Sequence, residues 1–357
     1  MSSSSNSLPP TFIRPRHFNT LSIHQIGNVS VVLKSSAERS LRAELFFYKS
    51  IPLALLGFFP KLLGHFETRE KDNVIQTVAL QYIPSTTLSQ SLTCAKLTTD
   101  SIRKLLQVLH KIHTTPASLS FVDDATLLDN YIPKLRARYL ENISLYDEHA
   151  INMADLDKVC EYLKEHKPLH ADIIHGDPVL TNILHSRDYN SFFFLDMRGS
   201  QGNIYTTCGD VYYDLSKVLQ SLCGYDHILS ASTFDPSYQR ALLTTFFEEV
   251  SLLYPKTSPW HIVLVTCSLL FSLLPLHDDT KARDKFVMLA QCLLRWLCFW
   301  RGKHISDEAL NEITALAQGV LHKFSTLLNT ETQKLGAQSG FDNSPVSPIE
   351  MVVTGYY

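Results

Sequence analysis

Apolar and polar residues alternate in the first part of the chain, as they do in a β-strand with one buried face. The segment Leu21–Lys34 alternates in this way around a turn at Gly27, which predicts a β-hairpin, and Asn73–Tyr82 predicts a further strand. Between them, Ala37–Ser50 carries apolar residues at helical spacing. This order predicts a small sheet that carries one helix.

Beyond Pro84 the apolar residues recur at the period of α-helices, beginning with Thr99–His113. Further helices are expected at Asp124–Ser144, Ala154–Glu165, Val211–Cys223, Pro236–Tyr254, Trp260–Leu273, Thr280–Trp300 and Asp307–Leu328. Two short apolar stretches, Asp172–Ile174 and Ser191–Leu195, interrupt the helices and are interpreted as a hairpin at a cleft. The pattern predicts an α+β chain with a small β-rich N-terminal lobe and a large helical C-terminal lobe.

Composition places the boundaries of these lobes. Residues 1–10 and 331–357 are rich in Ser, Pro, Gly and Gln without periodic apolar positions, and we expect them to be disordered tails. The N-terminal lobe then spans residues 11–83, and the helical lobe spans residues 84–330.

The overall composition argues against several classes of protein. The formal net charge is −3 and no Lys/Arg-rich run occurs, so nucleic acid is not an expected partner. Seven scattered cysteines without a CxxC motif, and an uncharged Ser-rich N-terminus, favour a cytoplasmic chain without disulfides or structural zinc. The apolar stretch Ile262–Leu276 is shorter than a bilayer span, so we expect a buried helix and no membrane.

One motif carries most of the chemistry. His175, Asp177 and Asn182 form an H-x-D-x4-N pattern, the spacing of kinase catalytic loops. In phosphoryl transfer one carboxylate orients the acceptor and takes its proton, while a second oxygen ligand holds Mg²⁺ on the phosphates. Asp196 follows the apolar run 192–195 and offers a rigidly held carboxylate for the same ion. The alternative interpretation is a surface turn with an Asx cap.

The predicted N-terminal sheet supplies a second pair of charged residues. Lys34 ends an apolar strand, and Glu44 follows ten residues later on the expected helix. In kinases such a lysine neutralises the α and β phosphates, and the helix glutamate holds it in place through an ion pair. A lysine at the end of a strand is often only a solvated charge, so this interpretation depends on the motif downstream.

The stretch His175–Val218 resembles the aminoglycoside phosphotransferase and choline kinase superfamily, which has a protein-kinase-like fold. Members carry an HGDxxxxN loop, a strand that ends in Asp, and a GDxxYDLAK segment, which here spans Gly209–Lys217. The resemblance implies that Asp177 is the catalytic base and that Asn182 and Asp196 bind magnesium. It also implies that Asp210 and Asp214 stabilise the site or contact substrate. For Asp210 a plain helix cap is the preferred alternative. His175 is interpreted as a structural residue that braces the loop.

The nucleotide site is expected on the N-terminal lobe. Gln81, Tyr82 and Ile83 resemble the hinge between kinase lobes, whose backbone groups hydrogen-bond adenine. No G-x-G-x-x-G or Walker sequence occurs, and the only material for a loop over the phosphates is Arg14–Leu21 with Gly27. This loop could therefore be degenerate and bind nucleotide weakly.

Arg198 lies two residues after the expected metal ligand, in a DMRG sequence. This form resembles the DPRG of phosphotransferase domains that accompany capsular polysaccharide or sugar-nucleotide biosynthesis. The planar fork of Arg198 suits an anionic group on the acceptor, and a salt bridge to Asp210 or Asp214 is an equally good alternative.

These features favour an ATP- and Mg²⁺-dependent kinase that phosphorylates a hydroxyl or amine of a small polar molecule, such as a sugar or polyol. The alternative is a catalytically weak or inactive protein of the same fold that senses nucleotide or serves as a scaffold, for which the missing glycine-rich loop is the support. A protein kinase is less favoured because DFG and APE motifs are absent. The sequence indicates neither the acceptor nor the oligomeric state.

Overall fold

The computed structural model describes most of the chain between residues 20 and 320. The described ranges are 20–37, 39–70, 73–117, 122–151, 153–186, 191–232, 235–306, 308–313, 315–316 and 319–320. The predicted tails, Arg14–Asn19 of the expected phosphate-covering loop and most of the predicted helix Asp307–Leu328 lie outside these ranges.

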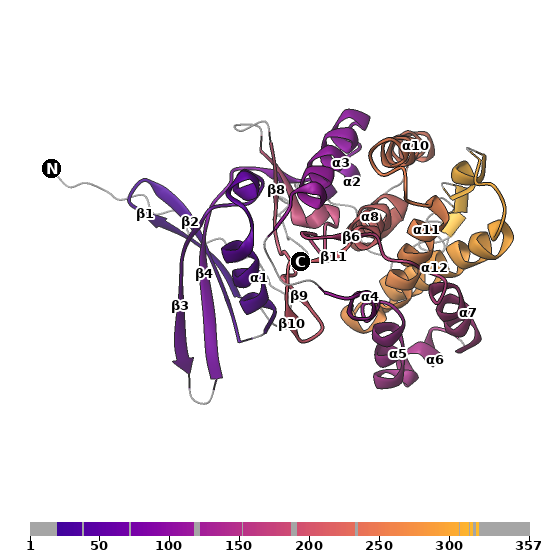
Figure 1. Cartoon of the computed structure of the whole chain (residues 1–357), viewed down its shortest axis with the longest axis horizontal. Coiled ribbons are helices and arrows are strands. Elements are labelled where there is room, and N and C mark those ends of the chain that lie inside the picture. The colour runs from indigo at the N-terminus through magenta and orange to yellow at the C-terminus, as the bar shows by residue number, and fades with distance from the viewer. Residues whose placement is uncertain are drawn as a thin grey trace, which may run out of the picture.

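The N-terminal part is an antiparallel sheet with a helix packed on it. The sheet order is β1-β2-β4-β3, and its strands are β1 (Thr20–Ile26), β2 (Val29–Ser36), β3 (Leu62–Glu70) and β4 (Asn73–Gln81). Helix α1 (Arg39–Ser50) lies on this sheet, followed by the short 3-10 segment Leu53–Phe58. Figure 1 shows this unit at one end of the molecule. The small sheet with one helix is therefore confirmed.

The edge strand β3 was not predicted from the sequence. It lies at the end of the sheet and pairs with β4, with an irregular register between Leu62 and Gly64. Most of its side chains are exposed and several are charged, as is common on edge strands that must avoid pairing with another chain. Such a strand lacks the apolar alternation by which the other strands were recognised.

The C-terminal part consists mainly of helices, which occupy the other end of the molecule (Figure 1). They are α2 (Leu88–Thr93), α3 (Thr99–Thr114), α4 (Asp124–Leu128), α5 (Ile132–Glu141), α6 (Ile143–Glu148), α7 (Met153–Leu163), α8 (Val211–Gln220), α9 (Asp226–Ser230), α10 (Pro236–Leu253), α11 (Pro259–Phe271) and α12 (Thr280–Trp300). The single helix expected at Asp124–Ser144 is divided into α4, α5 and the start of α6. Pro133 lies in the first turn of α5, where its missing N–H costs nothing, and it could not lie inside a longer helix.

Within the described ranges, short strands also occur in the C-terminal part and pair only with one another. They are β5 (Thr86–Thr87), β6 (His170–Ala171), β7 (Ile183–Ser186), β8 (Ser191–Phe194), β9 (Ser200–Gln201), β10 (Ile204–Tyr205) and β11 (Gly209–Asp210). The predicted hairpin of Asp172–Ile174 with Ser191–Leu195 is wrong. Instead β8 pairs with β7, and β6 pairs with β11. The apolar character of Ile173 and Ile174 reflects burial in the core and not strand pairing.

Helix α11 lies at the centre of the helical part. Its residues from Ile262 to Phe271 are buried, and it packs against α8 and α12. This burial on all sides explains the long apolar run, and the prediction of a buried helix is confirmed. Within the described part of the chain, no helix combines the length and the apolar character needed to span a bilayer.

Candidate active site

Lys34, Glu44 and Asp196 form a chain of ion pairs between the two parts of the molecule. Lys34 lies inside β2, two residues before the end of the strand, and its Nζ donates to Glu44 Oε2 of α1 at 2.6 Å. The same ammonium contacts the carboxylate of Asp196, which follows β8. Burial alone would lower the pKa of Lys34, but Asp196 and Glu44 raise it above its ordinary value. Lys34 is therefore a permanent cation.

Asp214 holds the loop that contains the H-x-D-x4-N motif. It lies in the first turn of α8 and accepts hydrogen bonds from the backbone N–H groups of His175 and Gly176, at 2.7 and 2.8 Å. His113 of α3 donates a third hydrogen bond to Asp214 through Nε2 at 3.0 Å, and the Tyr254 hydroxyl lies 2.9 Å from His113 Nδ1. Asp214 is fully buried, so its carboxylate contacts the loop and has no contact with solvent.

His175 lies beneath this loop with no exposed surface. Burial lowers the pKa of its imidazole, so the ring is neutral and can accept through Nδ1 the backbone N–H of Asp177, at 3.1 Å. Its backbone carbonyl accepts the N–H of Arg198 at 2.9 Å. His175 thus connects the loop to the segment that follows Asp196.

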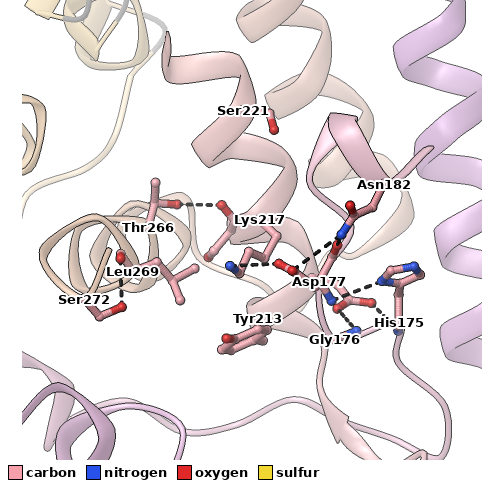
Figure 2. Close-up of polar contacts among 12 residues, drawn as sticks. His175, Gly176, Asp177, Asn182, Tyr213, Lys217, Ser221, Thr266, Leu269 and Ser272 are labelled. Atoms are coloured by element: carbon pink, nitrogen blue, oxygen red, sulfur yellow. Dashed lines mark hydrogen bonds and ion pairs between the residues drawn. The ribbon is translucent and has the colours of Figure 1, made fainter. Parts of the chain in front are cut away.

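The Asp177 side chain is the exposed acid of this loop, with 41% of its surface accessible. Lys217 of α8 lies 2.9 Å from Asp177 Oδ1, and the amide nitrogen of Asn182 donates to the Asp177 backbone carbonyl at 3.0 Å. Figure 2 shows Lys217 and Asn182 reaching Asp177 from different sides. Burial alone would raise the pKa of Asp177, but Lys217 lowers it below its ordinary value, with smaller effects of His175 and Arg198.

Asn182 and Asp196 approach each other through strand pairing. Ile183 of β7 lies opposite Phe194 of β8, and the Leu195 N–H donates to the Asn182 carbonyl at 2.8 Å. Among the described residues, the side-chain oxygen of Asn182 accepts no hydrogen bond. Asp196 has a positive φ of 59°, a conformation that non-glycine residues rarely adopt and that is often found at functional sites.

These two side chains suit Mg²⁺ but would not hold it alone. The ion prefers oxygen ligands and is commonly bound by one or two carboxylates together with substrate phosphates. Asp196 and Asn182 supply one carboxylate and one amide oxygen. Over the residues that the structure describes, no three His, Cys, Asp or Glu side chains gather into a metal site. The donor set therefore fits a metal that arrives with a phosphorylated ligand.

Gly199 allows the segment after Asp196 to approach α1. Its φ is +57°, and a Cβ at this position would lie 1.9 Å from the carbonyl oxygen of Ala43. Ala43 precedes Glu44, the partner of Lys34. Only glycine permits this contact, which fixes the spacing between Asp196 and the Lys34–Glu44 pair.

Asp210 has a structural set of partners. Its carboxylate accepts from Tyr131 at 2.6 Å and from the backbone N–H groups of Leu169 and Tyr212 at 2.9 and 3.0 Å, and His166 lies 2.7 Å away. The backbone contact to Tyr212 is an N-cap of α8. Asp210 therefore joins α8 to the preceding segments, as the helix-cap alternative described.

The expected hinge begins where β4 ends. The N–H of Gln81 donates to Lys61 at 2.9 Å, and the N–H of Tyr82 donates to Ser30 at 3.2 Å. Within the described ranges, the N–H of Ile83 donates no hydrogen bond. Of the three proposed adenine-binding residues, Ile83 is thus the one that retains a free backbone donor.

Several residues of the site were missed by sequence reasoning. Lys217 lies within the Gly209–Lys217 segment but was given no role, and its spacing of three residues from Asp214 was the available signal. Lys134 carried no signal, because pocket-lining and core residues look alike on amphipathic helices. Tyr213 belongs to the Gly209–Lys217 segment but, like His113, was given no role in the site. Arg198 makes no ion pair with Asp210 or Asp214, since both carboxylates have the other partners given above.

The profile of the phosphotransferase enzyme family matches residues 33–246. A thermostable mutant of aminoglycoside phosphotransferase APH(4)-Ia, in its apo form, is 12% identical with a TM-score of 0.51, over 88% of this chain and 94% of that chain. A ternary complex of a mutant of that enzyme with ADP and hygromycin B has the same identity and TM-score, over 88% and 93%.

Choline kinase LicA from Streptococcus pneumoniae is 15% identical with a TM-score of 0.41, over 85% of this chain and 89% of that chain. A comparison with curated protein sequences gives no match. The likeness to the aminoglycoside phosphotransferase confirms the predicted α+β, kinase-like architecture.

Proposed function

The chain belongs to the phosphotransferase enzyme family, and from this premise we propose that it is an ATP- and Mg²⁺-dependent kinase of a small polar molecule. The group that accepts the phosphoryl is a hydroxyl or amine, with a sugar or polyol as the favoured class. One observation carries the proposal: Lys34 and the loop of Asp177 both contact the segment Asp196–Arg198. Lys34 reaches Asp196 directly, and the Asp177 loop reaches Arg198 through His175.

Catalysis in this scheme is positioning together with charge neutralisation. Lys34 is a fixed cation at the edge of the N-terminal sheet and would hold the phosphates of the nucleotide. Asp177 would accept a hydrogen bond from the acceptor hydroxyl and orient it in line with the phosphoryl group. Because Lys217 lowers its pKa, Asp177 is a weak proton acceptor, and orientation is its main contribution. This suits a loose transition state, in which the hydroxyl loses its proton late.

Asp196 and Asn182 would hold magnesium, and adenine would meet the backbone of Ile83. When bound, the metal supplies charge compensation for the phosphate oxygens. Nucleotide use is supported by the complex of the distant aminoglycoside phosphotransferase with ADP. The proposed lobes, residues 11–83 and 84–330, would then enclose the nucleotide between them. The link to capsular polysaccharide or sugar-nucleotide biosynthesis stays a proposal based on the Asp196–Gly199 sequence.

The experiment that tests this function is a measurement of ADP release. The purified protein is incubated with Mg·ATP and a panel of sugars, polyols, amino alcohols and nucleosides. We expect release that depends on one class of acceptor and falls by at least about 100-fold in Asp196→Ala, because a metal ligand is lost. A melting curve of the variant establishes that the fold is retained.

A thermal titration with Mg·ATP separates the enzyme from the scaffold alternative. A ligand that binds the folded state raises the melting temperature by mass action. An unchanged melting temperature at millimolar Mg·ATP, together with no ADP release, would contradict the kinase proposal.

A further inference from the structure

A group of cationic side chains lies beside Asp177 on two helices. Lys134 and Arg138 are four residues apart on α5 and therefore share one face, as do Tyr213 and Lys217 on α8. The loop residue Arg198 completes the group. We call the four cations Lys134, Arg138, Arg198 and Lys217 the basic cluster.

The ring of Tyr213 is the centre of the basic cluster. The Lys134 ammonium donates to the Tyr213 hydroxyl at 2.8 Å. The Arg198 guanidinium lies 5.3 Å from the ring centroid, and the Lys217 ammonium lies 5.8 Å from it. Tyr213 is only 2% exposed, because the surrounding side chains, including these cationic groups, cover its ring. Figure 2 shows Tyr213 next to Lys217 and Asp177.

The positive charge of the basic cluster exceeds the negative charge that contacts it. Lys217 pairs with Asp177. In the part of the chain that the structure describes, Lys134, Arg138 and Arg198 have no carboxylate within ion-pair distance. Arg138 instead donates to the backbone carbonyl of Ser272 at 2.5 Å. Asp210 and Asp214, which lie close to Tyr213 in the sequence, are occupied by other donors.

The electrostatic balance leads to the same picture. Burial is the main cause that lowers the pKa of Lys134 to about 7; Tyr213 opposes this shift, and Arg198, Arg138 and Lys217 add to it. The cationic neighbours also lower the pKa of Tyr213, although burial alone would raise it. Like charges that outnumber the acid facing them, here Asp177 alone among the described residues, repel one another, and a bound anion would relieve this repulsion.

We propose that the basic cluster binds an anionic group of the phosphoryl acceptor, and that this group is a phosphate monoester. The inference rests on the proposed function, because it assigns the acceptor to the site of Asp177. A dianion balances the surplus charge better than a carboxylate does, and planar guanidinium groups suit its oxygen atoms. The acceptor hydroxyl would lie at Asp177, and its phosphate would lie among Lys134, Arg198 and Lys217. Cationic acceptors such as choline would be repelled.

The first test is binding of inorganic phosphate at constant ionic strength, followed by the melting temperature. We expect phosphate to stabilise the wild type by mass action, while chloride does not. In Lys134→Met and Arg198→Met the apparent affinity should fall by at least about tenfold, because each change removes a charge-assisted hydrogen bond. Methionine keeps most of the side-chain volume, so the fold is retained.

Arg136→Met is the matched control. Arg136 lies on the same helix, but it is about half exposed and pairs with Asp157 at 3.7 Å. Its loss removes the same charge from α5 outside the basic cluster, and phosphate affinity should stay at the wild-type value. Equal phosphate affinity in Lys134→Met, Arg198→Met and wild type, or no stabilisation of the wild type, would overturn the inference.

The second test compares matched acceptors in the ADP-release assay. Glycerol and glycerol 3-phosphate form one pair, glucose and glucose 6-phosphate form another, and choline is the cationic comparison. The phosphorylated member should have the higher kcat/KM, and Arg198→Met should reduce that advantage by at least about tenfold. An advantage of the neutral member, or a loss of equal size for both, would contradict the inference.

The two proposals fail in different ways. A protein that is not stabilised by Mg·ATP and releases no ADP contradicts the proposed kinase, whatever phosphate does. If the protein binds Mg·ATP but its phosphate affinity is unchanged in Lys134→Met and Arg198→Met, only the proposal of an anionic acceptor is contradicted. If neither pair of acceptors is a substrate, the phosphate titration alone tests whether the basic cluster binds an anion.

Discussion

Asp177 is both accessible to an acceptor and paired with a cation. It is exposed enough to meet an acceptor, and Lys217 at 2.9 Å keeps it ionised. A carboxylate whose pKa is lowered binds protons weakly. The main contribution of Asp177 is therefore to accept a hydrogen bond from the acceptor hydroxyl and to orient it. Lys217 thereby sets the pH range over which Asp177 can act.

The first prediction concerns that range. In Lys217→Met the main influence that lowers the pKa of Asp177 is gone, and burial then raises this pKa. Asp177 keeps its proton to higher pH, so the acidic limb of the kcat/KM profile should move to higher pH. The profile is measured from about pH 4 to pH 8 for both proteins, a range that brackets the ordinary carboxyl pKa. An unchanged acidic limb would show that Lys217 does not control Asp177.

The second prediction concerns Lys134, whose pKa is about 7. The groups that face it are Tyr213, Arg198, Arg138 and Lys217. Below this pKa Lys134 is charged and above it neutral, so anion affinity should be highest at low pH and fall as pH rises through about 7. Sulfate is the probe, because it does not titrate in this range. Thermal titrations at about pH 6 and pH 8 give the change, and it should be smaller in Lys134→Met, in which Tyr213 is the group of the site that still titrates.

At the scale of elements, the N-terminus of α8 organises the loop around Asp177. Asp214 in its first turn satisfies two backbone donors of the loop, and Asp210 caps the helix itself. A buried donor left without an acceptor costs roughly 1 to 3 kcal/mol. The loop conformation therefore depends on one side chain.

The third prediction follows from this dependence. Asp214→Ala should lower the free energy of unfolding by about 3 kcal/mol or more, because two buried N–H groups lose their acceptor. Asp235→Ala is the control, since Asp235 also accepts two backbone N–H groups, as the N-cap of α10, but at an exposed site. Its loss should cost about 1 kcal/mol. Equal costs in urea unfolding would contradict the role given to Asp214.

The fourth prediction tests the contact between the segment after Asp196 and α1. Gly199→Ala places a Cβ against the Ala43 carbonyl and should destabilise the protein by about 3 kcal/mol or more. Gly202 has a similar φ of +53° with open space around it. Gly202→Ala should therefore cost only the backbone strain, about 1 kcal/mol. The difference between the melting temperatures of the two variants measures the cost of the clash between the new Cβ and the Ala43 carbonyl. Similar melting temperatures would contradict the close contact of Gly199 with α1.

Most helices and the central strands of this chain could be predicted because one face of each is buried and their period is visible, and α11 could be predicted from its long apolar run. Three features could not be. Strand β3 has exposed side chains on both faces, so it shows no period. Strand β8 pairs with β7, its neighbour in the sequence, but β7 has only four residues and is too short to show a period. The division of Asp124–Ser144 is a partial exception, because Pro133, which favours the first turn of a new helix, is a signal for it in the sequence.

At the scale of the whole molecule, the site is assembled from distant segments. Lys34 and Asp196 are 162 residues apart in the sequence, and His113 and Asp214 are 101 residues apart. The sequence motif identified the acidic residues because the spacing within one loop is local. The basic cluster drew residues from α5 and α8, whose packing is not encoded by any short spacing, so Lys134 and Arg138 could not be assigned beforehand.

The central claim is that Asp177 orients an acceptor for transfer of the γ-phosphoryl group of ATP. Acceptor-stimulated ADP release, measured side by side for the wild type and Asp177→Asn, tests it most directly. The substitution keeps the size of the side chain, so Mg·ATP should still raise the melting temperature of the variant. We predict a loss of stimulated release of at least about 100-fold, in the range found for positioned acid–base groups. Stimulated release at the wild-type rate in Asp177→Asn would contradict the claim.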